Sequence, residues 1–177
     1  MTPLATRQQY VDYLSPWEQN IIHDLEMNIL DIWESLIQPN AIWTIASDGS
    51  YTGTKAAYAW ILHTPTKQQY AGTGPITGNP LSAFRAKLFG MCAWYCVVTH
   101  VIAYLQLENT IQICPFTDNT KVIHYHHHII SEKLLQTPYQ DNYNLFTMIK
   151  HYHHKVCLLY TSPSPRDGAT SRMPSSA

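Results

Sequence analysis

The chain has 177 residues, 45% of them hydrophobic and 13% charged, with a formal net charge of −1. This length fits one domain with a hydrophobic core plus some flanking sequence, and the composition excludes an intrinsically disordered chain. The charge argues against a strongly basic nucleic-acid-binding protein but leaves room for a local basic patch.

Neither a membrane segment nor a signal peptide is expected. No window approaches the roughly 18 consecutive apolar residues of a membrane span, and the N-terminal residues have no apolar segment after a basic start. The four cysteines lack the spacing of a disulfide framework. Cys92 and Cys96 are four apart in a predicted helix, where we expect small buried side chains. These features predict an intracellular protein, cytoplasmic or nuclear.

Residues 1–40 predict a helical lead-in. Ser15-Pro16 is a typical helix start, with an acidic residue in the first turn. The residues that follow carry the stripe of an amphipathic helix, at Ile21, Leu25, Ile29 and Ile32. Pro39-Asn40 is expected to end this helix. We interpret the lead-in as a connection from a preceding domain.

Three strands with short connections follow. Residues 41–46 form a β-rich run that leads into residues 47–50, a polar turn cluster. Residues 56–63 predict a second strand and residues 69–73 a third, joined by a turn at residues 65–67. Such short connections predict an antiparallel meander.

The hydrophobic period then becomes helical. Residues 81–107 predict a long helix with one apolar face, formed by Phe84, Leu88, Met91, Tyr95, Val98 and Ile102. A fourth strand is predicted at residues 110–116, helices at 119–135 and 141–154, and a fifth strand at 155–160. Strand–helix–strand order implies parallel pairing. The predicted fold class is α/β, with a mixed five-stranded sheet (three antiparallel strands, then parallel strands) and flanking helices.

Residues 161–177 differ sharply from the rest of the chain. They are rich in Ser, Pro and Arg and cannot bury an apolar face, so we expect disorder. They also resemble the peptide obtained when sequencing-adapter DNA is translated at the end of an assembled transcript. We interpret them as foreign sequence, with a natural disordered tail as the alternative, and expect the domain to span residues 41–160.

Two acidic residues are expected where strands end, Asp48 after the first strand and Asp118 after the fourth. Carboxylates at the ends of neighbouring strands converge on one rim of an α/β sheet, where divalent metals can be held. Each alone is also an ordinary turn former. The pair, in its strand–helix–strand setting, predicts a metal-dependent site.

Three segments in order, IASDGSYTGTKAAYAWIL, GNPLSAFRAKLFG and ICPFTDNTKVI, resemble blocks of the ribonuclease H family in its reverse-transcriptase-associated form. The resemblance covers about residues 42–160. It implies that Asp48 is the first metal-bridging carboxylate and that Asp118 is the carboxylate of the fourth strand. It also implies cleavage of the RNA strand of an RNA–DNA hybrid by two Mg²⁺ ions, which activate a water and stabilise the leaving oxygen.

The resemblance fails at two ligand positions. Lys87, in the run Arg85-Ala86-Lys87-Leu88, stands where the family has a glutamate. Like charges about 4 Å apart repel by roughly 4 kcal/mol at an effective dielectric constant near 20, so Lys87 opposes metal binding. The family's fourth carboxylate, expected after the fifth strand, is also missing, and that role is not carried over to Asp167 in the tail. Catalysis is therefore not expected. A lysine met without this resemblance would be interpreted as a solvated helix residue.

Two groups of histidines require a separate interpretation: His124, His126, His127 and His128, and then His151, His153 and His154. Pairs three or four apart on a helix could chelate a metal, but no cysteine or carboxylate completes a tetrahedral set at recognisable spacing. We expect solvent-facing side chains, with contacts to nucleic-acid phosphate as a minor role.

The leading hypothesis is a retroelement ribonuclease H-like domain that is inactive or impaired and is covalently linked to a polymerase domain. Weak binding to the RNA–DNA hybrid would use backbone and 2′-hydroxyl contacts. One alternative is a non-catalytic nucleic-acid-binding or packing module of a reverse transcriptase polyprotein. Another is a histidine-based metal-binding protein.

Overall fold

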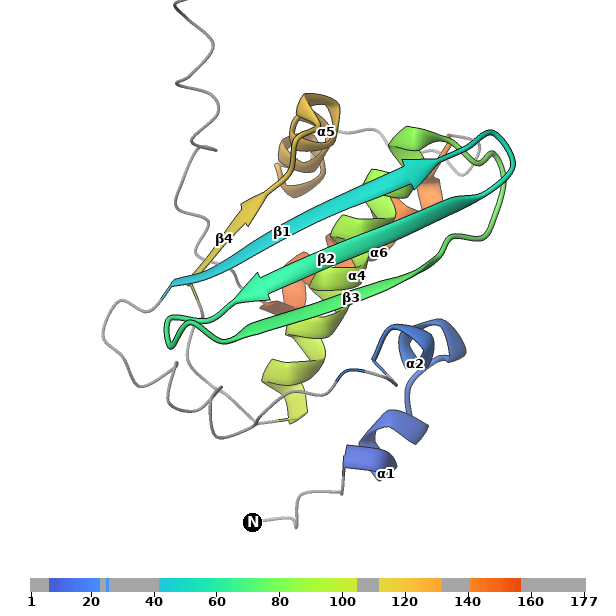
Figure 1. Ribbon diagram of the computed structural model, residues 1–177. Helices are drawn as coiled ribbons and strands as arrows, with labels where there is room; N and C mark the ends of the chain where they lie inside the picture. The colour runs from blue at the N-terminus through green and yellow to red at the C-terminus, as the bar shows by residue number, and fades with distance from the viewer. Residues whose placement is uncertain (1–6, 23–24, 26–41, 105–111, 132–140, 157–177) are drawn as a thin grey trace, which may run out of the picture.

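A computed structural model describes residues 7–22, 25, 42–104, 112–131 and 141–156 (Figure 1). In chain order, its elements are α1 (Arg7–Asp12), α2 (Pro16–Ile22), β1 (Ile42–Tyr51), β2 (Ala56–His63), β3 (Gln69–Pro75), α4 (Ala83–Tyr104), β4 (Gln112–Phe116), α5 (Thr120–Ile130) and α6 (Tyr143–Val156).

The sheet has the strand order β3-β2-β1-β4. β1 pairs antiparallel with β2 and β2 antiparallel with β3, whereas β1 pairs parallel with β4. The predicted meander and the predicted parallel fourth strand are therefore confirmed, and so is the mixed-sheet α/β class. β2 has the predicted bounds, and β3 extends two residues beyond its predicted end.

The number of strands in the prediction was wrong: the described residues form four, not five. Lys155 and Val156, expected to open the fifth strand, are the last residues of α6, and residues 157–160 lie outside the described residues. Residues 155 and 156 continue the helix because α6 is amphipathic and packs one face against the core. Its buried residues, one and then three positions apart, are Leu145, Phe146, Ile149 and Tyr152.

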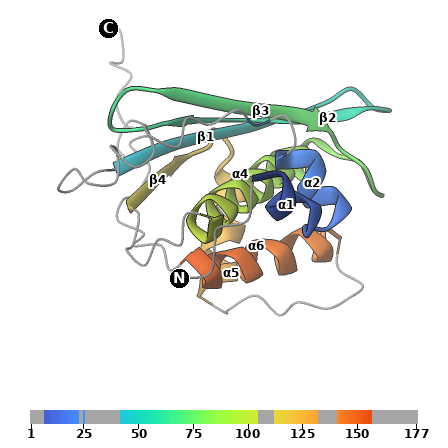
Figure 2. The same cartoon turned by 90° about the horizontal axis from the view of Figure 1, so that it is seen from below.

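The helices lie on one face of the sheet, with α4 directly beneath the strands and α6 beyond it (Figure 2). The core between the sheet and α4 uses alternate residues of the strands, because successive strand side chains point to opposite faces. Trp43 and Ile45 of β1 and Trp60 and Leu62 of β2 are all buried in this layer.

α4 is the central element of the fold. Its N-terminus is capped by Ser82, whose Oγ accepts a hydrogen bond from the Arg85 backbone N–H at 3.0 Å. The helix is buried on nearly every side from Arg85 to Thr99, including Cys92 and Cys96, as expected for these cysteines. By length and composition α4 could cross a membrane, but 72% of its apolar window is buried inside the protein, so core packing accounts for its hydropathy.

The lead-in differs from its prediction. α2 begins at Pro16, as predicted, and Ile21 is buried, but the helix ends at Ile22 instead of continuing. The backbone N–H of Leu25 donates to the carbonyl of Ile22, three residues back, and not to a carbonyl four residues back as in an α-helix. Leu25 is buried outside any helix. The rest of the predicted stripe lies outside the described residues.

α5 begins where the sequence indicates. Asn119 is its N-cap, and the Asn119 side chain accepts a hydrogen bond from the Val122 N–H at 3.0 Å. The helix ends at Ile130, earlier than the predicted residue 135, and residues 132–140 lie outside the described part of the chain.

Candidate active site

Asp48 lies within β1 and not after it. Residues 47–50 were predicted as a turn, but the antiparallel ladder continues through them, pairing Asp48 with Ala59 and Tyr51 with Ala56. The turn prediction was wrong because cross-strand pairing with β2 overrides the local turn preference of Ser-Asp-Gly-Ser.

The parallel pairing of β1 with β4 nevertheless brings the two predicted carboxylates together. The last parallel pair is Ala46 with Phe116. Asp48 and Asp118 each follow that pair by two residues, so they occupy equivalent positions where β4 has ended.

Glycines let α4 approach β1 closely at this point. A Cβ on Gly49 would lie 2.2 Å from the Ala86 carbonyl carbon and 2.4 Å from the Lys87 nitrogen. A Cβ on Gly90, one turn along α4, would lie 2.9 Å from the Asp48 carbonyl oxygen. Only residues without a side chain fit in this contact, which places the Lys87 backbone against β1.

Lys87 bridges the two aspartates. Its Nζ lies 2.8 Å from Asp48 Oδ1 and 2.7 Å from Asp118 Oδ1. The carboxylates are 65% and 48% exposed, whereas the Lys87 side chain is only 18% exposed. All three sequence-predicted site residues therefore meet at one point, and Lys87 is not a solvated surface lysine.

The charges of this cluster stabilise one another. Hydrogen bonds to Asp118 and then to Asp48 raise the pKa of Lys87 above its usual value. The hydrogen bond from Lys87 lowers the pKa of Asp48, and the Gly49 N–H, which donates to Asp48 Oδ1 at 2.7 Å, adds to this effect. The ammonium is therefore a fixed counter-ion for both carboxylates at neutral pH.

Both carboxylates border a cavity of about 930 Å³ along the sheet. Small and apolar side chains form much of its floor, among them Ala46, Ala59, Ala71 and Phe116. Asp48 and Asp118 thus border a concave surface whose volume far exceeds that of a metal ion.

Arg85 anchors the first turn of α4, two residues before Lys87. It is 4% exposed, and its guanidinium donates to the side-chain oxygens of Asn142 and Asn144 at 3.1 and 3.3 Å and to the Thr77 carbonyl at 3.3 Å. Burial lowers its pKa. Arg85 thereby ties α4 to the start of α6 and fixes the position from which Lys87 extends.

The histidines do not all face solvent. His124, His127 and His151 are exposed, as predicted, and His154 lies outside the residues whose side chains are described. The prediction of a solvent-facing side chain was wrong for His126, which is buried. Its Nε2 lies 2.7 Å from the Tyr95 hydroxyl. That hydroxyl also lies 3.2 Å from Nδ1 of His153. Burial, with nearby His153 and His127, lowers the pKa of His126 to about 3. This histidine is a neutral core residue.

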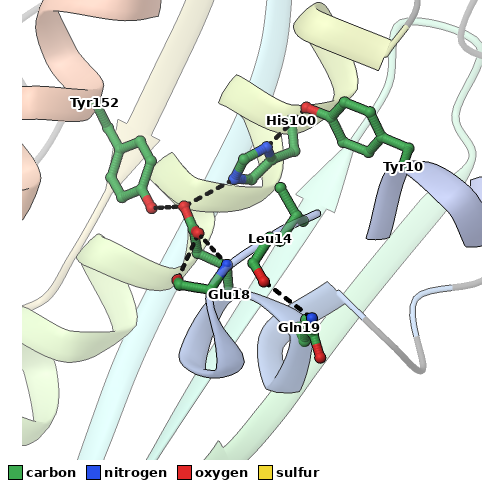
Figure 3. A network of polar contacts seen from close by, with 7 residues as sticks. Tyr10, Leu14, Glu18, Gln19, His100 and Tyr152 are labelled. Atoms are coloured by element: carbon green, nitrogen blue, oxygen red, sulfur yellow. Dashed lines mark hydrogen bonds and ion pairs between the residues drawn. The ribbon is translucent and has the colours of Figure 1, made fainter. Parts of the chain in front are cut away.

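A second polar cluster, which the sequence analysis missed, joins α2 to α4 and α6 (Figure 3). Glu18 Oε1 lies 3.1 Å from His100 Nε2 and accepts a hydrogen bond from the Tyr152 hydroxyl. Burial would raise the pKa of Glu18, but hydrogen bonds from Ser15, Tyr152 and His100 lower it to about 2. The Ser15-x-x-Glu18 spacing of a helix N-terminus was a signal for Glu18, whereas its distant partners had none.

The sequence matches no protein-family model, and no curated protein matches it. Solved structures do match. LC11-RNase H1 in complex with an RNA/DNA hybrid has a TM-score of 0.50 at 10% identity, over 72% of this chain and 88% of that one. The N-terminal RNase H domain of a Mycobacterium tuberculosis protein, fused to maltose binding protein, has a TM-score of 0.49 at 13% identity, over 73% and 87%.

A third structure is the foamy viral protease-reverse transcriptase in complex with an RNA/DNA hybrid. It has a TM-score of 0.49 at 6% identity, over 81% of this chain but only 19% of the viral protein. At 10% identity, the similarity to LC11-RNase H1 is evidence for the fold alone. The chain has a ribonuclease H-like fold.

Proposed function

We propose that this chain is the ribonuclease H-like domain of a reverse-transcribing element that binds RNA–DNA hybrid but does not cleave it. The observation that carries the proposal is the position of Lys87 Nζ, within 2.8 Å of both Asp48 Oδ1 and Asp118 Oδ1. The three sequence segments that resemble the reverse-transcriptase-associated family contain these residues and support the origin.

The residues of the cluster do not fit the two Mg²⁺ ions that the family resemblance implies. Mg²⁺ requires oxygen ligands at about 2.0–2.1 Å in near-octahedral geometry. Here an ammonium takes the inner oxygen of each carboxylate, and it would repel a cation brought between them. The three side chains sum to one negative charge, so the electrostatic attraction for two divalent ions is weak. No catalytic step is therefore assigned to this site.

The surface next to the cluster supports binding to a nucleic-acid backbone. α5 begins immediately after Asp118, and its exposed Lys121 and His124 lie in the first turns of that helix. Lys121 Nζ lies 4.7 Å from the centre of the Phe84 ring, which holds the charge near the N-terminus of α4. Phosphate contacts by such residues position a duplex without reading its sequence.

Hybrid cleavage and binding by the full chain test the proposal together. We expect no Mg²⁺-dependent cleavage of a labelled RNA–DNA hybrid, and binding that is the same with Mg²⁺ and with EDTA. Asp48→Asn should leave binding unchanged, because no metal is involved. Robust cleavage by the unmodified chain would contradict the loss of activity, and absence of hybrid binding would contradict the retained function.

Lys121→Ala tests the binding surface. Loss of one phosphate contact reduces the slope of log affinity against log salt by about 1. The matched control is Lys67→Ala in the β2–β3 turn, which should leave the slope unchanged. Equal slopes for the two variants would show that α5 does not contact the hybrid.

A polyprotein setting also belongs to the proposal. α2 packs on α4, and we propose that the lead-in connects this domain to a preceding polymerase domain. Cys92, Cys96 and Cys114 are free thiols, which supports a reducing, intracellular compartment.

A further inference from the structure

Three possible metal ligands of different chemistry meet beneath the sheet, away from the Lys87 cluster. One ligand atom from each of Glu18, Cys96 and His100 lies within 4.8 Å of the other two. Cys96 and His100 are four apart on α4 and so project from the same face of that helix, and Glu18 reaches them from α2. Within the described part of the chain, no other group of three or more such residues comes this close.

The donor set matches one class of metal ion. A thiolate, an imidazole and a carboxylate are the three kinds of ligand that Zn²⁺ takes in proteins, whereas Mg²⁺ and Ca²⁺ take oxygen ligands alone. Two anionic ligands also balance the charge of a divalent ion. That balance matters here because the Cys96 side chain is fully buried and the Glu18 and His100 side chains are only 17% and 11% exposed.

Hydrogen bonds to Glu18 and His100 already orient their ligand atoms toward one another. Glu18 Oε2 is held by the backbone N–H and the hydroxyl of Ser15, at 3.0 and 2.5 Å, which leaves Oε1 directed at His100 (Figure 3). The Tyr10 hydroxyl lies 2.9 Å from His100 Nδ1 and orients the ring so that Nε2 faces Glu18. A partner on the second ring nitrogen is what metal-binding histidines usually have.

We propose that Glu18, Cys96 and His100 form a zinc site that joins α2 to α4, with a water as the fourth ligand. Binding replaces the thiol proton of Cys96 by the metal and releases that proton to solvent. The metal also takes the place of the proton on Nε2 of the neutral His100 ring, which moves to Nδ1, where the Tyr10 oxygen accepts a hydrogen bond from it. No oxidant or reductant is involved. The site would link α2 to α4. It is separate from the proposed hybrid-binding surface, so a test of the zinc site does not depend on the proposed function.

Cobalt titration of the full, chelator-treated chain tests the proposal. Co²⁺ in a tetrahedral site with one thiolate gives visible d–d bands and a near-ultraviolet thiolate charge-transfer band. We expect both bands at one equivalent, and their loss when Zn²⁺ is added. The exposed histidines of α5 could also bind Co²⁺ but cannot produce the thiolate band, so that band reports on a cysteine site.

Variants identify the cysteine. Cys96→Ser should abolish the charge-transfer band, while Cys92→Ser, a matched control one turn earlier and equally buried, and Cys114→Ser in β4 should retain it. Tyr10→Phe should weaken metal binding by about 10–100-fold, because it removes the partner of His100. Glu18→Gln should weaken it too and provides a second test if Cys96→Ser does not fold.

A thermal measurement completes the test. Zn²⁺ should raise the melting temperature of the unmodified chain and of Cys92→Ser, because a ligand that binds only the folded state stabilises it. It should leave the melting temperature of Glu18→Gln nearly unchanged. The absence of a thiolate band in the unmodified chain, or its persistence in Cys96→Ser, would overturn the zinc site and leave a hydrogen-bonded network only.

Discussion

Two carboxylate clusters of this protein make similar contacts in different surroundings. At the edge of β1, Lys87 bridges two aspartates that are 65% and 48% exposed. Beneath the sheet, Glu18 is 17% exposed and meets His100 and Tyr152. Water competes more strongly with the first set of contacts than with the second, so the first contributes little to stability and the second contributes more. A lysine at position 87 is therefore compatible with an intact fold.

The largest loss of stability is expected from Gly49→Ala, which disrupts the close contact of β1 with α4 beneath the Lys87 cluster. The new Cβ meets backbone atoms of Ala86 and Lys87 that cannot rotate away. We expect a loss of about 3 kcal/mol in the free energy of unfolding, at the upper end of overpacking costs. Urea denaturation measures it, with exposed Ser50→Ala as the control; equal stability of the two variants would contradict the close approach.

Tyr152→Phe tests how much the buried Glu18 cluster contributes to stability. It removes one hydrogen bond to the Glu18 carboxylate, and hydrogen bonds to charged groups contribute about 1.5–3 kcal/mol. We expect about 2 kcal/mol of destabilisation by chemical denaturation. Tyr13→Phe, at a side chain that is 88% exposed, is the control and should change stability by less than about 0.5 kcal/mol. A loss no larger than the control's would show that the buried network is not stabilising.

The burial of His126 should make the free energy of unfolding depend on pH. Its pKa of about 3 in the folded protein lies below the value of about 6.5 in an unfolded chain. Between these values the unfolded chain binds the extra proton, so stability falls as the pH falls below 6.5, by up to about 1.4 kcal/mol per pH unit. His126→Gln should flatten the curve of unfolding free energy between pH 6.5 and 4. Parallel curves for the two proteins would refute a buried neutral histidine.

The smallest effect on stability is expected from Lys87→Met. Exposed ion pairs contribute about 0.2–1 kcal/mol each, so the unfolding free energy should fall by about 1 kcal/mol or less. The pKa of Asp48 should rise, because it loses its cation and keeps Asp118 as a neighbour. Carboxyl chemical shifts in an NMR titration report that rise. An unchanged pKa would mean that Lys87 does not contact Asp48 in solution.

Local pattern predicted much of this fold. The strand signal in residues 56–63 predicted β2 with the bounds that the structure shows, and Asn119 marked the start of α5. The error at residues 47–50 has a physical cause: Ser-Asp-Gly-Ser favours a turn locally, and only the ladder with β2 makes it a strand. Family-like blocks identified Lys87, but its contact with Asp118, 31 residues away, depends on the register of β1 with β4.

His126 and the Glu18 cluster show which buried contacts a local sequence pattern can predict and which it cannot. His126 shares a helical face with Val122 and Ile129, both buried, so its spacing of four and three carried a signal that was missed. Glu18 and His100 are 82 residues apart, and no local pattern links them. Such a contact follows from the packing of α2 on α4, which sequence periodicity does not determine.

Divalent-cation binding at the β1 edge tests the central claim most directly. Mn²⁺ titrations of the full chain, followed by line broadening of the Asp48 and Asp118 carboxyl signals, compare the unmodified protein with Lys87→Gln. If the ammonium fills the cation position, Lys87→Gln should bind Mn²⁺ at least about tenfold more tightly, a difference of about 1.4 kcal/mol. Adding Asp48→Asn should remove that gain. Equally tight binding by the unmodified protein through the same two aspartates would contradict the claim.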